Sequence, residues 1–339
     1  MVTKTDKYLN KFVASQTAGD VKVLVQAPGF EYRFESENAL PMHFIASSTK
    51  LYTNTLIFKL IDNGQLKLNT VVADVLGRET LVGLTKPGNE SVITIEHLLT
   101  HTSGIADYFG DKIPGGKSLF DDIVAKDRGW TYEELLERAR AVGIHSEPGK
   151  NAHYSDTNYQ LLGRVFETIS GSSYATALSE LITRPLGLEK TFVLTGSEDL
   201  TNVSIMLYGE SALDIPAAMA STGCDGGIVS TTDETMKFLK AYYEGSLFSP
   251  EFSDPSKQNW RRIFPPLKYG VGQMKLSLPR FMTGFRSVNP LHGHSGASGH
   301  VMFFDPISST RYVATVNQTK DRSLVFKLLI NLQIRLRDV

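Results

Sequence analysis

The stretch Phe44-Ile45-Ala46-Ser47-Ser48-Thr49-Lys50 joins a short apolar run to three small hydroxyl residues and a lysine. It leads into residues 51–64, where apolar side chains recur at helical spacing before Asn63-Gly64 supplies a stop. This pattern places Ser47 at the N-terminus of a helix, where free backbone N–H groups favour negative charge. Lys50 follows three residues later and so projects from the same helix face. A hydroxyl nucleophile needs such neighbouring groups, because an amine can hold its proton and N–H donors can stabilise an oxyanion.

Ser-x-x-Lys is also a common pattern. On its own it more often marks a capping serine followed by an exposed lysine. The rest of the chain has to decide between the two interpretations.

The composition is that of a globular protein of ordinary charge. The chain has 339 residues, of which 41% are hydrophobic and 21% charged, enough for a large core and two lobes. Its 35 basic and 36 acidic residues give a net charge of −1, so we expect neither a nucleic-acid partner nor attraction to an anionic membrane. Cys224 is the single cysteine, which excludes an internal disulfide and a cysteine-based metal cage.

The N-terminal residues 1–7 contain no apolar core, and the chain has no long run of apolar residues. Neither a signal peptide nor a membrane span is therefore predicted. We expect a cytoplasmic protein, with the alternative that an export signal was removed from the sequence.

Local patterns predict strands at both ends of the chain and helices between them. Helices are expected at 4–17, 95–100, 131–142, 158–170, 173–182, 233–244 and 321–337. Residues 21–26 and 32–35 read as a hairpin, and further strands are expected at 269–274, 299–304 and 312–317.

These elements predict an α/β (α+β) fold with a central antiparallel sheet, built from the N- and C-terminal segments and flanked by helices. Residues 1–64 and 205–339 would form the sheet lobe, and residues 65–204 an inserted, mostly helical lobe. The active cleft is expected where the two lobes meet.

Two further stretches could complete a site with Ser47. In His153-Tyr154-Ser155-Asp156 a loop tyrosine precedes a helix. Beside an ammonium its phenolate is stabilised, so its pKa is expected to fall and it could act as a general base. The alternative is a tyrosine that packs its ring and leaves its hydroxyl on water.

The second stretch, Gly293-His294-Ser295-Gly296-Ala297-Ser298-Gly299-His300, lies directly before a predicted strand. Small residues there would let a ligand lie against the strand edge, near free N–H groups. The alternative is a glycine-rich turn. A phosphate loop is excluded, because neither its lysine nor a Gly-x-Gly-x-x-Gly motif is present.

The order Ser-x-x-Lys, Tyr-x-Asp and His-x-Gly resembles that of the serine hydrolases of the class C β-lactamase and D-alanyl-D-alanine carboxypeptidase family, which also contains the family VIII carboxylesterases. Residues 97–104 and 226–233 resemble further recurrent segments of this family. The resemblance spans roughly residues 20–335 and implies a β-lactamase/transpeptidase-like fold.

The resemblance also implies roles for individual residues. Ser47 would be the acylated nucleophile, Lys50 the neighbouring amine, and Tyr154 the base in acylation and the partner of the leaving group. The backbone N–H groups of Ser47 and Ala297 would form the oxyanion hole. A Ser-Lys-Tyr cluster is expected to lower the pKa of both the amine and the phenol toward working pH.

Departures from the family pattern affect the predicted substrate-binding residues His294, Ser295, Gly296, Asp156 and Arg286. His294 stands where β-lactamases of the family have lysine, which replaces a permanent cation by a group that is mostly neutral at pH 7. Asp156 stands where asparagine is usual; it cannot donate to a substrate amide, but it can pair with Lys50. Arg286 could supply the missing positive charge, although a solvated surface arginine is the commoner situation.

Two other enzyme classes are excluded. His97 and His101 have the spacing of a metalloprotease pair, but Leu98 follows the first histidine where glutamate is required. The Gly-x-Ser-x-Gly elbow of α/β-hydrolases is absent. We therefore expect an enzyme without metal or cofactor.

The predicted function is hydrolysis of short-chain carboxylic esters through an acyl-enzyme, with weak or no β-lactamase activity. The expected partner is a small-molecule ester or amide substrate. Alternatives are a D-amino-acid-specific peptidase or carboxypeptidase, a β-lactamase, or a penicillin-binding-like module that acylates without turnover. The presence of Ser47, Lys50 and Tyr154 together argues against the last.

Overall fold

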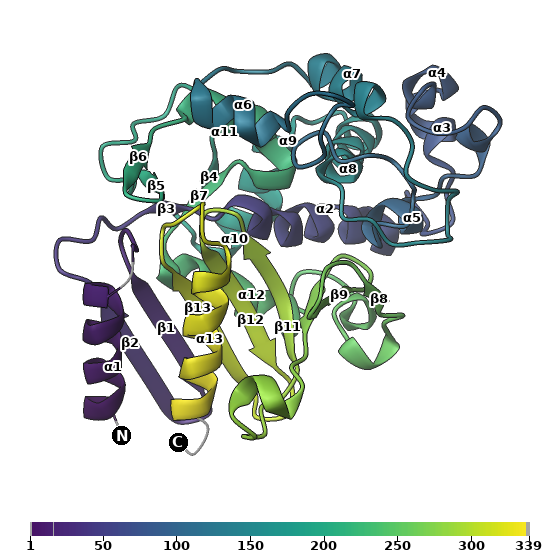
Figure 1. Cartoon of the computed structure of the whole chain (residues 1–339). Coiled ribbons are helices and arrows are strands. Elements are labelled where there is room, and N and C mark those ends of the chain that lie inside the picture. Colours follow the sequence, from purple (N-terminus) through teal and green to yellow (C-terminus); the bar gives the residue numbers. More distant parts are fainter. Residues whose placement is uncertain (1, 16, 337–339) are drawn as a thin grey trace.

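An eight-stranded antiparallel sheet forms one half of the molecule in the computed structural model, which describes residues 2–15 and 17–336 (Figure 1). The strand order is β2-β1-β13-β12-β11-β10-β9-β8. The strands are β1 (Lys22–Ala27), β2 (Phe30–Glu35), β8 (Arg261–Arg262), β9 (Leu267–Tyr269), β10 (Met274–Leu276), β11 (Leu291–Gly296), β12 (His300–Asp305) and β13 (Thr310–Thr315). β1 pairs with β13, so the N-terminal hairpin and the C-terminal strands share one sheet, as predicted.

Helices cover both faces of this sheet. The terminal helices α1 (Val2–Ser15) and α13 (Ser323–Leu336) lie on one face, and α12 (Thr232–Tyr243) packs on the other (Figure 1). Alternation along β1 explains this arrangement: Val23 and Val25 pack with the terminal helices, whereas Leu24 belongs to the larger core on the opposite face.

The other half of the molecule is mainly helical (Figure 1). Its helices are α2 (Lys50–Asp62), α3 (Val72–Leu76), α4 (Arg78–Leu81), α5 (Ile95–Leu99), α6 (Leu119–Ala125), α7 (Tyr132–Val142), α8 (Asp156–Ser170), α9 (Tyr174–Leu178), α10 (Arg184–Leu186) and α11 (Pro216–Gly226). Short strands form two small sheets, with β3 (His43–Phe44), β7 (Ile228–Ser230) and β4 (Phe192–Val193) in one and β5 (Met206–Tyr208) and β6 (Ser211–Leu213) in the other. Single turns are η1 (Ala46–Thr49), η2 (Asn89–Ser91), the π-turn η3 (Ser179–Thr183), η4 (Pro250–Phe252), η5 (Pro255–Lys257) and η6 (Arg280–Thr283).

Helix α2 is the element that connects the two halves. It packs against α8 and α11 on the helical side and against β11 of the sheet. Almost all of its residues are buried, including Lys50, Thr53, Asn54 and Thr55. A helix predicted from an apolar stripe is therefore enclosed on nearly every side, and its buried polar groups need partners.

The structure confirms the predicted fold class, the N-terminal hairpin and the terminal helices. The predicted strand at 269–274 is wrong, because it spans the turn between β9 and β10, where Gly272 has φ 74°. The stretch expected before a strand is itself β11 as far as Gly296. A Cβ on Gly293 would overlap the Met302 carbonyl oxygen of β12, so glycine is needed in this strand for close approach.

The predicted lobe boundaries stay a prediction. Figure 1 places β5, β6 and α11 with the helices rather than with the large sheet. Within residues 2–15 and 17–336, no helix is both long enough and apolar enough to span a membrane.

Candidate active site

Ser47 lies in the turn η1, which packs directly on the end of β11. The Ser298 hydroxyl donates to the Phe44 carbonyl oxygen over 2.7 Å. A Cβ on Gly296 would overlap the carbonyl oxygen of Ile45, so only glycine lets the strand approach this closely. As a result, Ser47 and Ala297, the two predicted oxyanion-hole residues, line the same cavity.

Lys50 begins α2 and is completely buried. Its Nζ lies 2.6 Å from Asp156 Oδ1 and donates to the Asp225 carbonyl oxygen over 2.7 Å. Burial lowers the pKa of Lys50, but the neighbouring acidic groups, Asp156 first among them, outweigh it and hold that pKa well above its usual value. The resting amine is thus an ammonium, and the predicted fall of its pKa is wrong because Asp156 supplies a buried counter-charge.

Tyr154 immediately precedes α8, and its ring lies 5.3 Å from Lys50 Nζ and 4.4 Å from the ring of His101. Burial raises the pKa of its phenol; Asp156 raises it further, while Lys50 and Ser47 lower it. The expected drop in the pKa of the phenol is therefore wrong too, because loss of hydration exceeds the help from Lys50. The buried hydroxyl has no well-aligned hydrogen bond within the described part of the chain.

Two further buried carboxyl groups accompany Asp156. Asp107 Oδ1 accepts the Asp156 backbone N–H over 2.9 Å, and Asp225 Oδ2 accepts the Tyr108 hydroxyl over 2.7 Å. Burial and the charge of Asp156 raise the pKa of Asp107 to about 7 and that of Asp225 well above its usual range. One buried ammonium cannot balance three buried carboxylates, so the ion pair with Asp156 favours the protonated form of the other two acids.

Sequence reasoning missed Asp107 and Asp225 as members of this cluster. Asp225 lies at the end of α11, which is kinked at Gly223, where φ is 39°. The kink brings the Asp225 carbonyl oxygen to Lys50. The glycines around Asp225 are the sequence signal for this kink. The contact it makes possible joins α11 to α2, which lie far apart in the sequence and so could not be predicted locally.

His294 lies on β11 with its side chain completely buried. Its Nδ1 lies 2.8 Å from the Ser295 carbonyl oxygen, which can only accept, so Nδ1 carries the proton. Nε2 therefore accepts from the Tyr269 hydroxyl over 3.1 Å. Burial, assisted by the charge of Lys50, lowers the pKa of His294 to about 3, so the imidazole is neutral. Tyr269, the last residue of β9, was not among the predicted site residues, because its contact with His294 joins two separate strands.

Other predicted substrate residues differ in their positions. The Ser295 hydroxyl donates to the Met274 sulfur of β10 over 3.5 Å, and Ser295 is not among the residues that line the cavity. Arg286 is exposed just after η6 and is not among the residues that line the cavity. Its proposed role toward a substrate charge stays a prediction.

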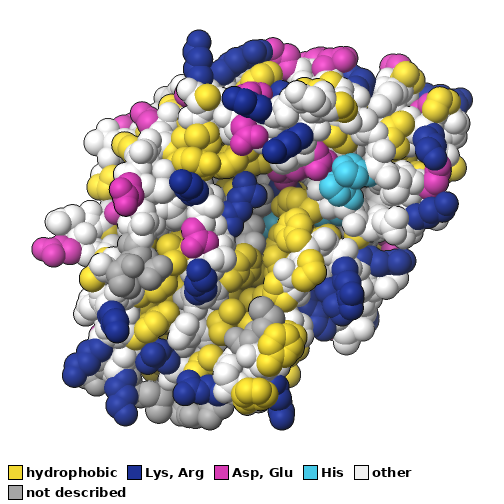
Figure 2. All heavy atoms as spheres, viewed as in Figure 1, with side chains coloured by type: hydrophobic (Ala, Val, Ile, Leu, Met, Phe, Trp, Pro, Cys, Tyr) yellow, Lys and Arg dark blue, Asp and Glu magenta, His cyan; other side chains and the backbone are white. Residues whose placement is uncertain are grey.

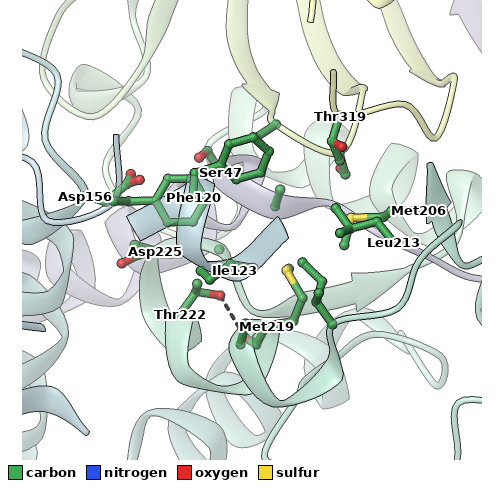
Figure 3. A pocket seen from close by; sticks show the side chains of 17 residues that line it. Ser47, Phe120, Ile123, Asp156, Met206, Leu213, Met219, Thr222, Asp225 and Thr319 are labelled. Carbon is green, nitrogen blue, oxygen red and sulfur yellow. Dashed lines mark hydrogen bonds between the residues drawn. The ribbon is translucent and has the colours of Figure 1, made fainter. Parts of the chain in front are cut away.

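The cavity beside Ser47 has a mostly apolar wall (Figure 3). Asp156 and Asp225 lie at one side of it, while Met206 and Leu213 lie at the other. Its remaining apolar side chains, apart from Ala297, are Ala46, Phe109, Phe120, Ile123, Ile215, Ala218 and Met219. Most of these side chains come from α6, β5, β6 and α11, which meet only in the folded chain, so local patterns in the sequence did not identify this wall.

Comparison with known proteins supports the resemblance found in the motifs. Residues 39–333 match the family model described as Beta-lactamase. The chain is 30% identical over 204 residues to penicillin-binding protein 4 of Amycolatopsis lactamdurans, covering 58% of the chain and 50% of that protein. It is also 30% identical over 207 residues to the D-alanyl-D-alanine-carboxypeptidase/endopeptidase AmpH of Escherichia coli K12, covering 60% and 49%. The chain thus spans about half the length of these relatives.

Solved structures show the same fold at low identity. D-amino acid amidase from Ochrobactrum anthropi SV3 superposes with a TM-score of 0.79 at 19% identity over 100% of both chains. The hydrolase EstCE1 has a TM-score of 0.72 at 19% identity, covering 98% of this chain and 97% of its own. Since the family model matches most of the sequence, the protein belongs to the β-lactamase family of serine hydrolases.

Proposed function

We propose that this protein is a carboxylesterase that forms an acyl-enzyme on Ser47, acts on short-chain esters and turns β-lactams over weakly or not at all. The observation that carries the proposal is the 2.6 Å contact between Lys50 Nζ and Asp156 Oδ1. A carboxylate held in this way has no proton to donate to a substrate amide carbonyl. With His294 neutral, the site also lacks the cation that would anchor a substrate carboxylate.

The proposed chemistry needs three groups of this chain. Ser47 Oγ attacks the ester carbonyl while its proton passes to the phenolate of Tyr154, and the oxyanion accepts N–H bonds from Ser47 and Ala297. The C–O bond to the alcohol then breaks, and the leaving oxygen takes the proton from Tyr154. Water attacks the acyl-enzyme in the same way, giving up a proton to Tyr154 that returns to Ser47 Oγ.

Lys50 would act on Tyr154 by its charge. Its ammonium lies 5.3 Å from the ring and is held there by Asp156 and by the Asp225 carbonyl oxygen. A fixed positive charge favours the phenolate at the moment the proton leaves. Lys50 is thus proposed as an electrostatic partner rather than as the proton acceptor.

The apolar wall supports an apolar acyl group on the substrate. Phe109, Phe120, Met206 and Leu213 line the cavity next to Ser47. Burying the methylene groups of an acyl chain against such a surface is favourable in free energy, whereas a charged acyl chain would lose its hydration there without finding a partner.

A D-amino acid amide is the second candidate substrate. Asp156 lies on the cavity wall, where a carboxylate could accept a substrate ammonium. The D-amino acid amidase of Ochrobactrum anthropi shares the fold, and D-alanyl-D-alanine carboxypeptidase is named among the relatives. The ion pair between Asp156 and Lys50 argues against this candidate, because it leaves the carboxylate less available to a substrate ammonium.

Turnover of p-nitrophenyl butyrate, nitrocefin and D-phenylalanine amide by wild type and Ser47→Ala tests the proposal. We expect steady turnover of the ester, far above that of the other two, and its loss in Ser47→Ala. Faster turnover of the amide would favour the second candidate. A single burst of p-nitrophenol equal to the enzyme concentration, without further turnover, would point to a binding module and contradict both.

A further inference from the structure

Three side chains outside the cavity converge on one point of the surface. His145 Nε2 lies 3.0 Å and His153 Nε2 lies 2.8 Å from the same oxygen, Oδ2 of Asp111. The two imidazole rings stack with centroids 3.5 Å apart. Side-chain exposure is 38% for His145, 29% for His153 and 22% for Asp111, so an ion could reach the group from solvent.

The donor set and its spacing suit a small transition-metal ion. Two imidazole nitrogens and one carboxylate oxygen are the ligands of many zinc sites that keep a fourth position for water. In tetrahedral zinc geometry, ligand atoms lie about 3.3 Å apart. Here the three available ligand atoms all lie within 4.8 Å of one another, so small side-chain rotations would complete the site.

We propose that Asp111, His145 and His153 form a binding site for Zn²⁺, with a water molecule as the fourth ligand. The sequence does not predict this site, because Asp111 lies in a different loop from His145 and His153, and the spacing of the three residues matches no metal motif. Figure 2 shows histidine side chains at the surface next to acidic ones. The site is independent of the esterase proposal, since the ion would take no part in the reaction.

The position of the site suggests what a bound ion would do. Asp111 Oδ2 also accepts the Asp107 backbone N–H over 2.8 Å, and Asp107 in turn holds the backbone N–H of Asp156. His153 directly precedes Tyr154. A bound zinc ion would therefore cross-link the Asp107–Asp111 loop to the segment that carries Tyr154. We expect the bound ion to stabilise the fold by linking these two segments.

Metal titration of the full chain after treatment with a chelator tests the site. Isothermal titration with ZnCl₂ should give one ion per chain, and bound Co²⁺ should show the visible absorption bands of a four-coordinate site. His145→Ala, His153→Ala and Asp111→Asn should each weaken Zn²⁺ binding at least tenfold. Zinc should raise the melting temperature of the wild type more than that of any of these three variants. His97→Gln is the matched control: it removes another half-buried imidazole but keeps an acceptor for the capping box of α5, so binding should not change.

The proposal is overturned if the wild type binds no more Zn²⁺ than a variant in which all three residues are replaced. It is also overturned if the single variants bind as tightly as wild type. In either case the group is a hydrogen-bonded trio only. Circular dichroism of each variant separates loss of the site from loss of the fold, and Asp111→Asn keeps the side-chain shape and an acceptor for Asp107 if His145→Ala or His153→Ala unfolds.

Discussion

Lys50 is the one ammonium at the centre of a cluster that also holds Asp107, Asp156 and Asp225. Its partner Asp156 decides two properties at once, the charge of the amine and the lack of a donor toward substrate. Replacing one carboxylate oxygen of Asp156 by an amide nitrogen therefore tests both properties: it removes the negative charge beside Lys50 and adds a donor toward the substrate.

Asp156→Asn should raise turnover of nitrocefin and D-phenylalanine amide relative to p-nitrophenyl butyrate, because the new amide group can donate to a substrate carbonyl. The stability cost should be about 1–3 kcal/mol, below that of breaking most buried ion pairs, because the protonated Asp225 can ionise and replace the lost charge. Paired kinetics and urea unfolding measure both. An unchanged substrate ratio in a folded variant would argue against the proposed role of Asp156.

Tyr154 should make the reaction faster at alkaline pH. Burial raises the pKa of its phenol, so only a small fraction is phenolate at neutral pH, and this fraction grows tenfold with each pH unit. We expect kcat/KM for p-nitrophenyl butyrate to rise from pH 7 to 9 in wild type. Tyr154→Phe should be about 10²- to 10⁴-fold slower and lose this rise.

Spontaneous ester hydrolysis also increases with pH, so Ser47→Ala serves as the blank at each pH. A wild-type profile that is flat between pH 7 and 9 after this correction would show that the phenolate of Tyr154 is not the proton acceptor.

At the scale of elements, the contact between β11 and η1 sets the distance from Ala297 to Ser47. It is close because residue 296 is glycine and because Ser298 bonds to the strand β3 through the Phe44 carbonyl oxygen. The oxyanion hole proposed here is thus a property of two elements far apart in sequence.

Gly296→Ala should push β11 away from η1, since its Cβ would overlap the Ile45 carbonyl oxygen. We expect a loss of about 1–3 kcal/mol in unfolding free energy and a much larger relative loss of esterase activity. Gly129→Ala is the matched control, because a Cβ there meets its nearest neighbour only at 3.7 Å. Full activity of Gly296→Ala would rule out the proposed role of this contact.

At the scale of the whole molecule, buried histidines should control acid stability. Burial lowers the pKa of His43 and His294 to about 3, that of His292 to about 4, and those of His101 and His300 well below the usual value. Unfolding exposes these imidazoles, which then take up protons below about pH 6.5. Each therefore contributes stability that is lost as pH falls below that value.

Asp107 and Asp225 act in the opposite direction. Their raised pKa values keep protons on the folded protein above pH 3.8, so their contribution falls as pH rises toward about 7. On unfolding near pH 5, the five imidazoles take up about five protons and the two carboxyl groups release about two. The net uptake is therefore about three protons.

The unfolding free energy should therefore rise by about 4 kcal/mol per pH unit around pH 5. Urea unfolding between pH 4.5 and 7 measures this slope. A free energy that stays constant or falls over this range would mean that the histidines titrate normally in the folded protein.

Short-range patterns in the sequence were enough for the terminal helices, the hairpin at 22–35 and the motif order Ser47, Lys50, Tyr154. These depend on periodicity, turn residues and spacing, which are local properties. The strand β11 was missed because its glycines resemble a turn, and they are needed only for contacts with β12 and η1.

The tertiary structure alone decided the proton states and the neighbours of the site. The pKa directions of Lys50 and Tyr154 were predicted with the wrong sign, because they depend on burial and on Asp156, Asp107 and Asp225, which arrive from distant segments. The apolar cavity wall and the cluster of Asp111, His145 and His153 could not be predicted from the sequence for the same reason. A sequence determines which chemical groups are present and their local geometry, whereas hydration and charge pairing exist only after the chain has folded.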